Sequence, residues 1–252
     1  MNRKKIDWMK MVYHYTTFES AIHIIVSNSL KFGHFKNMND ISEVKRDIMC
    51  MKPESFKEEI DRYKAICLTS STKDTMGFDI PPLWGHYAQK GNGVCLLFDR
   101  EELLSQLNKQ YPNHCTPGQP LINYVVNYSN ATGPADINKE GDEPLNDGEI
   151  LNIFYTKAID WKYESEYRLL IRNDREDNVI DIGDALQSII VCFPKEELIK
   201  NHVNYKILRK LLPSRLPIFH YTTQIGNRLL HDENGKKIWP IEGIDYELDL
   251  GE

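Results

Sequence analysis

Short apolar segments of strand length are mixed with amphipathic helical stretches along this chain, and this mixture most constrains the fold. The segments predicted as strands are residues 11–15, 65–69, 94–98, 161–172 and 188–193, with further candidates at 121–128 and 216–222. A doubly wound parallel sheet would need strands and helices in regular alternation, which this order lacks. The sequence therefore predicts a single α+β domain over residues 1–252, with a central, mostly antiparallel mixed sheet flanked by helices.

Helices are predicted where apolar residues recur with a period of about 3.6 residues. The clearest stretch follows the first strand and is closed by Gly33, with Thr16 as its expected N-cap and Glu19 completing a capping box. The other helical stretches are residues 43–63, which Pro53 interrupts, and 83–88, 100–110, 150–156 and 195–212. Residues 112–149 combine prolines, glycines and acids, which indicates an excursion or mobile loop, most mobile at 129–149.

The composition and charge of the chain argue against several classes of protein. With 31 basic and 37 acidic side chains the net charge is −6, which disfavours broad non-specific binding to nucleic acid or to an anionic membrane. No apolar run approaches the ~20 residues that a membrane helix needs, and residues 1–7 lack the apolar region of a signal peptide. The five cysteines are an odd, widely spaced set, which argues against disulfides and structural zinc. We therefore expect a reduced, cytoplasmic protein.

The signature motifs of several large enzyme classes are missing from the sequence. There is no GxGxxG after a strand, no GxxxxGK[ST], no HExxH and no GxSxG. Gly91 and Gly93 stand between a helical stretch and a strand, where a turn is expected. Rossmann oxidoreductases, P-loop NTPases, zincins and α/β-hydrolases are all disfavoured.

The most informative stretch, residues 161–171, places charged residues at alternate positions of a predicted strand. Lys162, Glu164, Glu166 and Arg168 would share one face, with aromatic and apolar residues on the other. One interpretation is a solvated face whose opposite charges form a ladder. The other is functional, because two carboxylates about 6–7 Å apart on one face can do acid–base work or stabilise an oxocarbenium-like centre.

Further candidate residues lie at a strand end and on a helix. His14 stands where the first strand meets a helix, which suits ligand contact, although in isolation such a residue is more often a half-buried histidine with a backbone hydrogen bond. The similar stretch around His220 is interpreted as a coincidence. Tyr87 either packs its helix or exposes its ring as a stacking platform for a planar ligand.

Segments with a recognisable pattern follow one another between about residues 11 and 195. They are Tyr13-His14-Tyr15-Thr16, Asn39-Asp40-xx-Glu43, Trp84-xx-Tyr87-Ala88 with Gly93-Val94-Cys95-Leu96-Leu97-Phe98-Asp99, and Lys157-xxx-Trp161-xx-Glu164-x-Glu166-x-Arg168. In this order they resemble the bacterial family catalogued as domain of unknown function 2971. The name of that family implies no activity.

The layout is also distantly similar to ADP-ribosyltransferase folds, in which a first-strand histidine, a tyrosine-bearing helix and a later Glu-x-Glu strand surround NAD. This resemblance implies that NAD is the substrate and that Glu166 is the catalytic glutamate. It implies that His14 holds the nicotinamide-side ribose, that Tyr87 stacks on nicotinamide and that Glu164 orients or activates the acceptor. The residues implied to contact NAD are Tyr13, His14, Thr16, Ser70 and Tyr87.

Enzymatic and non-enzymatic functions are both compatible with these residues. The leading expectation is an NAD-consuming ADP-ribosyltransferase or NAD glycohydrolase, such as a toxin or phage-defence effector with a neutralising partner, in which His14, Tyr87 and Glu166 line one pocket. The acceptor stays open between protein, nucleic acid, small molecule and water. The alternatives are a non-catalytic nucleotide- or protein-binding module on the same fold, and a hydrolase or nuclease with a metal held by Glu164, Glu166 and Asp40, or by Asp40, Glu43 and Glu166.

Overall fold

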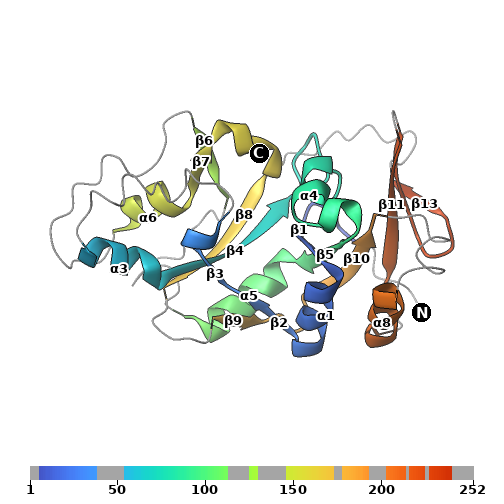
Figure 1. Cartoon of the computed structure of the whole chain (residues 1–252), viewed down its shortest axis with the longest axis horizontal. Coiled ribbons are helices and arrows are strands. Elements are labelled where there is room, and N and C mark those ends of the chain that lie inside the picture. Colours follow the sequence, from blue (N-terminus) through green and yellow to red (C-terminus); the bar gives the residue numbers. More distant parts are fainter. Residues whose placement is uncertain are drawn as a thin grey trace. The chain divides into compact units, whose positions relative to one another are not determined.

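The computed structural model describes residues 6–38, 54–112, 125–129, 146–172, 178–192, 203–213, 216–224 and 227–239. Helices combine with a mixed sheet in which antiparallel neighbours predominate, which confirms the α+β class (Figure 1). The chain divides into two compact units. Unit 1 holds Met1–Ser29, Thr69–Leu103 and Ile182–Glu252, and unit 2 holds Leu30–Leu68 and Leu104–Asp181. The single domain expected over residues 1–252 stays a prediction.

Unit 1 is built on strands that come from distant parts of the chain. In spatial order they are β13 (Lys237–Trp239), β12 (Asn227–His231), β11 (Ile218–Gln224), β10 (Leu186–Val191), β5 (Val94–Asp99), β1 (Met11–Thr16) and the end of β4 (Tyr63–Ser70). The pair β10 and β11 runs parallel, and the other neighbours described here are antiparallel. A parallel pair needs a crossover, and α8 (Val203–Leu211) lies between β10 and β11 in the chain.

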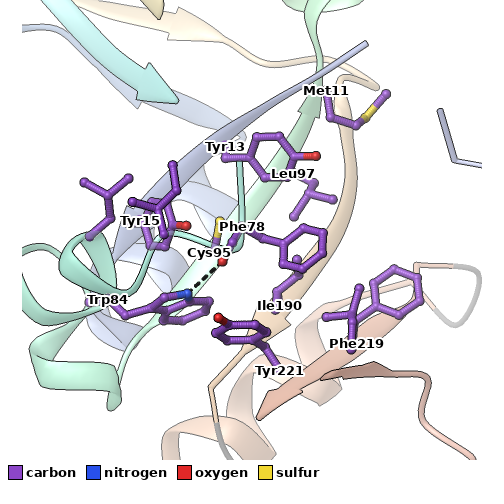
Figure 2. Close-up of a cluster of buried hydrophobic side chains, with 14 residues drawn as sticks. Met11, Tyr13, Tyr15, Phe78, Trp84, Cys95, Leu97, Ile190, Phe219 and Tyr221 are labelled. Carbon is purple, nitrogen blue, oxygen red and sulfur yellow. Dashed lines mark hydrogen bonds between the residues drawn. The ribbon is translucent and has the colours of Figure 1, made fainter. Parts of the chain in front are cut away.

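The register of this sheet places one set of aromatic and apolar side chains on a common face. Tyr13 lies opposite Leu97 and Tyr15 opposite Cys95, so these side chains point to the same side. Helix α4 (Pro81–His86) covers this face with buried side chains. We call the resulting core the aromatic cluster (Figure 2); its buried members include Tyr13, Tyr15, Phe78, Ile80, Leu83, Trp84, Cys95, Leu97, Ile190, Phe219, Tyr221 and Leu230.

Helix α1 (Phe18–Ser27) has a different N-cap from the predicted one. Thr16 still belongs to β1, where it pairs with Val94, so the chain turns into the helix at Thr17. The Thr17 side chain accepts a hydrogen bond from the backbone N–H of Ser20 at 3.0 Å and is the N-cap. The predicted capping box of Thr16 and Glu19 is therefore wrong.

Unit 2 contains a second group of strands and helices. Its strands are β2 (Ser29–Lys31), β3 (Gly33–His34), most of β4, β6 (Asn127–Ser129), β7 (Thr156–Ala158), β8 (Glu166–Arg172) and β9 (Val179–Asp181). Strand β4 pairs with β3 and β8, β2 pairs with β9, and β6 runs parallel to β7. The helices of unit 2 are α3 (Glu54–Arg62), α6 (Asp147–Phe154) and the short 3-10 helices η1 (Phe35–Asn37) and η3 (Ile159–Glu164). The 3-10 helix η2 (Gln89–Gly91) belongs to unit 1. Helix α5 (Arg100–Gln110) begins in unit 1 and continues in unit 2. None of the described helices is long and apolar enough to span a bilayer.

Several predicted element boundaries are corrected by the structure. The strand predicted over residues 161–172 begins at Glu166, because residues 159–164 form η3 and Ser165 has a left-handed backbone (φ 45°, ψ 49°) that no strand accommodates. Strands β12 and β13 form where no strand is predicted. The predicted excursion at 112–149 contains β6 and the start of α6, and the rest of its predicted mobile part lies outside the described residues, as does 39–53.

Candidate functional site

Charged side chains from β7, η3 and β8 meet inside unit 2. Lys157 Nζ lies 2.6 Å from a Glu164 oxygen and 3.2 Å from a Glu166 oxygen, and Arg168 Nη2 lies 2.7 Å from the other Glu166 oxygen. Their exposed fractions are 7% for Lys157, 5% for Glu164, 3% for Glu166 and 0% for Arg168. We call these residues the charge cluster. The interpretation as a solvated ladder is wrong, because these carboxylates and cations lie out of the solvent.

The backbone at Ser165 explains why the two carboxylates converge. Glu164 ends η3, Ser165 takes the left-handed conformation, and Glu166 opens β8. This break in the strand alternation lets both carboxylates bind the same ammonium group. Lys162, which the strand prediction places on the same face, is instead exposed on η3.

Glu166 is held from several directions. Its Oε1 accepts a hydrogen bond from Arg168 Nε at 2.8 Å in addition to the Nη2 contact, and its Oε2 accepts one from Lys157. Its backbone N–H donates to the Tyr128 hydroxyl at 2.8 Å. Arg168 is itself anchored, because Nη1 donates to the carbonyl oxygen of Phe154. The Glu166 carboxylate is therefore fixed in position through both oxygens.

The ionisation of Glu166 reflects a balance between burial and its cationic neighbours. Burial raises the pKa of this carboxyl, but Arg168 and Lys157, with hydrogen bonds from Cys67 and Arg168, outweigh burial and hold the pKa below its usual range. Glu166 is therefore an ionised carboxylate at neutral pH. Burial raises the pKa of the neighbouring Tyr128 hydroxyl, so this group stays neutral there.

Lys157 makes two bonds of different length in the charge cluster. Lys157 contacts Glu164 at 2.6 Å and Glu166 Oε2 at 3.2 Å, so the bond to Oε2 is the longer of the two. A ligand hydroxyl could replace that bond while Lys157 stays paired with Glu164. The charge cluster, with two carboxylates and two cations, is formally neutral, and within it Glu166 is the oriented carboxylate that can oppose a positive centre developing next to Oε2.

The other predicted site residues lie in unit 1, and Tyr13 is among the core residues there (Figure 2). The Tyr13 hydroxyl donates to the carbonyl oxygen of Trp8 at 2.9 Å, and the Tyr15 hydroxyl donates to that of Gly77 at 2.7 Å. Tyr13 is 0% exposed. Tyr13 is thus a buried core residue whose hydroxyl is bonded to the backbone. The NAD contact that the resemblance implies for it stays a prediction.

The segment before α4 is tied to the aromatic cluster by further polar contacts. Trp84 Nε1 donates to the carbonyl oxygen of Phe78 at 2.9 Å, which Figure 2 shows as a dashed line. The Tyr221 hydroxyl donates to a carboxylate oxygen of Asp79, and Arg228 Nη1 lies 3.3 Å from both Asp79 oxygens. Sequence reasoning missed Asp79 and Tyr221. The available signal was a single acid between Phe78 and an apolar run that begins at residue 80.

His14 points away from the aromatic cluster. It stands between Tyr13 and Tyr15 in β1, and alternate side chains of a strand point to opposite faces. Tyr87 directly follows α4 and is half-buried against the aromatic cluster. The structure therefore does not bring His14 and Tyr87 together on one face of β1.

The remaining predicted residues are dispersed. Thr16 is 8% exposed at the end of β1, and Ser70 pairs with Val12 where β4 meets β1. His220, which the sequence analysis treats as a coincidence, is buried in β11. Asp40 and Glu43 lie outside the described residues. Within the described ranges no group of His, Cys, Asp or Glu side chains is arranged to hold a metal ion.

Sequence reasoning also missed Lys157 as the centre of the charge cluster. Lys157 belongs to the motif that ends at Arg168, but it precedes the strand predicted over residues 161–172 and so was not assigned to the charged face of that strand. The available signal was its place four residues before Trp161. In the structure the centroid of the Trp161 ring lies 4.7 Å from Lys157 Nζ. An aromatic ring over a lysine shields the ammonium group from water, so its charge has to be compensated by an acidic side chain.

Comparison with known proteins supports part of the resemblance seen in the sequence. No curated protein and no solved structure matches the chain, and the similarity to ADP-ribosyltransferase folds stays a prediction. The segment around His14 lies outside the one matched range, whereas the segments that begin at Trp84 and Lys157 lie inside it. Over residues 83–169, which include the whole charge cluster, the chain matches the family described as Protein of unknown function (DUF2971).

Proposed function

We propose that this protein is an NAD-consuming enzyme of the ADP-ribosyltransferase or NAD glycohydrolase type, with Glu166 as the carboxylate that stabilises the transition state. The observation that carries this proposal is the buried, ionised Glu166, whose two oxygens are fixed by Arg168 and Lys157. A charge that is already oriented in a water-poor site stabilises a developing opposite charge without further reorganisation.

The proposed reaction uses this charge at the anomeric carbon of the nicotinamide ribose. The bond between C1′ and nicotinamide breaks, and its electron pair leaves with nicotinamide. Positive charge then builds on C1′ and the ring oxygen, and Glu166 opposes it while accepting a hydrogen bond from a ribose hydroxyl at Oε2. Water or an acceptor nucleophile adds to C1′ and loses its proton to solvent. Glu164, which Lys157 binds at 2.6 Å, orients that nucleophile.

His14 and Tyr87 enter the proposal as separate hypotheses. The resemblance gives them the ribose contact and the nicotinamide stacking, but they do not share one face of β1. Substituting each alone by alanine distinguishes their roles: Tyr87→Ala should raise KM for NAD more than it lowers kcat if it stacks. A His14→Ala variant with unchanged kinetics removes His14 from the site without touching the role of Glu166.

The experiment that tests the proposal is the release of free nicotinamide from labelled NAD. Glu166→Gln should lower the rate by a factor on the order of 10²–10³, because one oriented stabilising group of the transition state is lost. Glu164→Gln should impair transfer to an acceptor more than cleavage of NAD. Near-wild-type nicotinamide release by both variants would remove the charge cluster from the active site.

A matched control separates chemistry from stability. Glu59 is likewise a nearly buried glutamate of unit 2, and both of its oxygens bind Arg172, at 2.8 and 3.0 Å. Glu59→Gln therefore also removes a paired carboxylate, yet it should leave nicotinamide release unchanged in protein that circular dichroism shows to be folded. A similar loss of activity in both variants would indicate a general effect of destabilisation.

A second candidate is a nucleotide-binding module without turnover. The observation that favours it is the complete pairing of Glu166, which is only 3% exposed and whose oxygens already have cationic partners. This candidate predicts that calorimetry detects NAD binding while no nicotinamide is released. Glu166→Gln would then lower the stability of the protein and leave nicotinamide release absent, as in the wild type.

A further inference from the structure

Helix α8 carries exposed apolar side chains in one line. Val203, Ile207 and Leu211 are 70%, 40% and 41% exposed, and their spacing of four residues places them along one side of the helix over about 12 Å. Tyr205 and Leu208, elsewhere on the helix circumference, are buried. We call the three exposed residues the α8 stripe. A contiguous line of exposed aliphatic side chains on an otherwise anchored helix is a candidate binding surface.

Basic side chains border the α8 stripe. Lys206 and Lys210 are exposed and lie together along one edge of it, as their spacing requires. The helix contains no aspartate or glutamate, although the chain as a whole has a net charge of −6. The third cation of the helix, Arg209, is bound to Glu233 at 3.4 Å. The stripe is therefore an apolar surface with a basic edge on an acidic protein.

The sequence of residues 240–252, PIEGIDYELDLGE, has the complementary composition. It holds five acidic residues and no basic one, so it carries −5 of the net charge of −6. Apolar residues alternate with the acids, most regularly from Ile244 to Leu250. Apolar side chains interleaved with carboxylates match an apolar stripe with a lysine edge in both hydrophobicity and charge.

We propose that residues 240–252 bind the α8 stripe of the same chain. The place of α8 relative to β13 makes this contact reachable, because Arg209 touches Glu233 in the turn between β12 and β13. Trp239 lies six residues after Glu233, a separation of at most ~20 Å, whereas the 13 residues after Trp239 can extend over about 43 Å. The segment is thus long enough to return from β13 to α8.

Charge favours this occupant over a second copy or a membrane. Two stripes facing each other would give Lys206 and Lys210 no acidic partner, because α8 contains no aspartate or glutamate. An anionic membrane would repel a chain with a net charge of −6. The stripe also lacks the exposed Trp or Phe side chains that helices in the membrane interface commonly use.

Carbodiimide cross-linking of the protein with residues 1–252 tests the contact, because this reagent joins an ammonium group to a carboxylate within direct reach. We expect amide cross-links from Lys206 or Lys210 to Asp245, Glu247 or Asp249, identified by mass spectrometry. In a mixture of ¹⁵N-labelled and unlabelled protein, the two peptides of each cross-link should carry the same label, because both come from one chain.

Matched substitutions identify the surface. Ile207→Asp should lower the cross-link yield about tenfold, equivalent to about 1.4 kcal/mol, because it places a carboxylate inside the α8 stripe. Ile159→Asp is the control, since Ile159 is also an isoleucine that is 40% exposed, and it should leave the yield unchanged. Circular dichroism checks that both variants are folded.

Several results would overturn the proposal. The stripe is not the binding site if the carboxylates of residues 240–252 cross-link equally to lysines outside α8. The same conclusion follows if Ile207→Asp leaves the cross-link yield unchanged. Cross-links between differently labelled chains would assign the stripe to a second copy. Binding to phosphatidylserine vesicles that Ile207→Asp abolishes, without any cross-link, would assign it to a membrane.

Discussion

Arg168 binds a single oxygen of Glu166 through two of its nitrogens, Nε at 2.8 Å and Nη2 at 2.7 Å. Both side chains are buried, with Arg168 0% and Glu166 4% exposed. Removing one partner of such a pair leaves the other charge buried and uncompensated, which costs about 3–5 kcal/mol. The pair therefore couples the chemistry proposed for Glu166 to the stability of unit 2.

Glu166→Gln is expected to lower the free energy of unfolding at pH 7 by about 3–5 kcal/mol. The pKa of Glu166 is lower in the folded than in the unfolded chain, so its charge stabilises the fold above the unfolded pKa of about 4.3. This contribution is lost as the pH falls through the lowered folded pKa. Urea unfolding between pH 7 and pH 3 should show the difference between wild type and variant shrink only at the acid end. A difference that is constant over this range would contradict the ionised Glu166.

Lys157→Met should destabilise the protein most at neutral pH. The substitution keeps much of the volume of the side chain but removes the ammonium that Glu164 and Glu166 share, at 2.6 and 3.2 Å. The two carboxylates would then repel each other, and protonation of one relieves the repulsion. Thermal unfolding should therefore show a deficit that is largest at pH 7 and narrows toward pH 4. Exposed Lys162→Met is the control and should change little at either pH.

The pattern of apolar residues was sufficient to predict the central strands of the fold. The segments 11–15, 65–69, 94–98 and 188–193 are buried or nearly buried runs, and all lie within or largely overlap strands of the structure. The strand pair β12–β13 escaped prediction because Lys236 and Lys237 interrupt its apolar pattern, although Asn234-Gly235 is a strong turn signal.

The candidate site was only partly predictable, because its geometry depends on one residue with an unusual backbone. Glu164 and Glu166 were identified from their spacing, but nothing in a serine between them indicates a left-handed conformation. The strand pattern therefore gave an exposed ladder, where the structure has a buried cluster. The role of Lys157 depends on contact with η3, which a period of two residues cannot predict.

Tyr15→Phe should lower the free energy of unfolding by about 1–3 kcal/mol, because it leaves the buried carbonyl oxygen of Gly77 without its donor. Burial raises the pKa of Tyr15 well above its usual value, so this loss should be the same from pH 6 to pH 9. The control is Tyr111→Phe, whose hydroxyl donates to the carbonyl of Val179 at the surface, where water can replace it. Urea unfolding of both variants measures the contrast, and equal losses would contradict the buried bond.

Gly77→Ala should be far more damaging than Gly85→Ala. A Cβ at position 77 would lie 2.3 Å from Cδ2 of Tyr13, whose ring is fully buried, so the ring or the backbone of this segment must shift. Such overpacking typically costs about 1–3 kcal/mol. A Cβ at position 85 meets nothing within 4 Å, and alanine in place of glycine inside helix α4 should be neutral or stabilise by roughly 0.5–1 kcal/mol. Melting temperatures and intrinsic tryptophan fluorescence check both variants. If Gly77→Ala melts at the wild-type temperature, the close packing of Tyr13 on this segment is wrong.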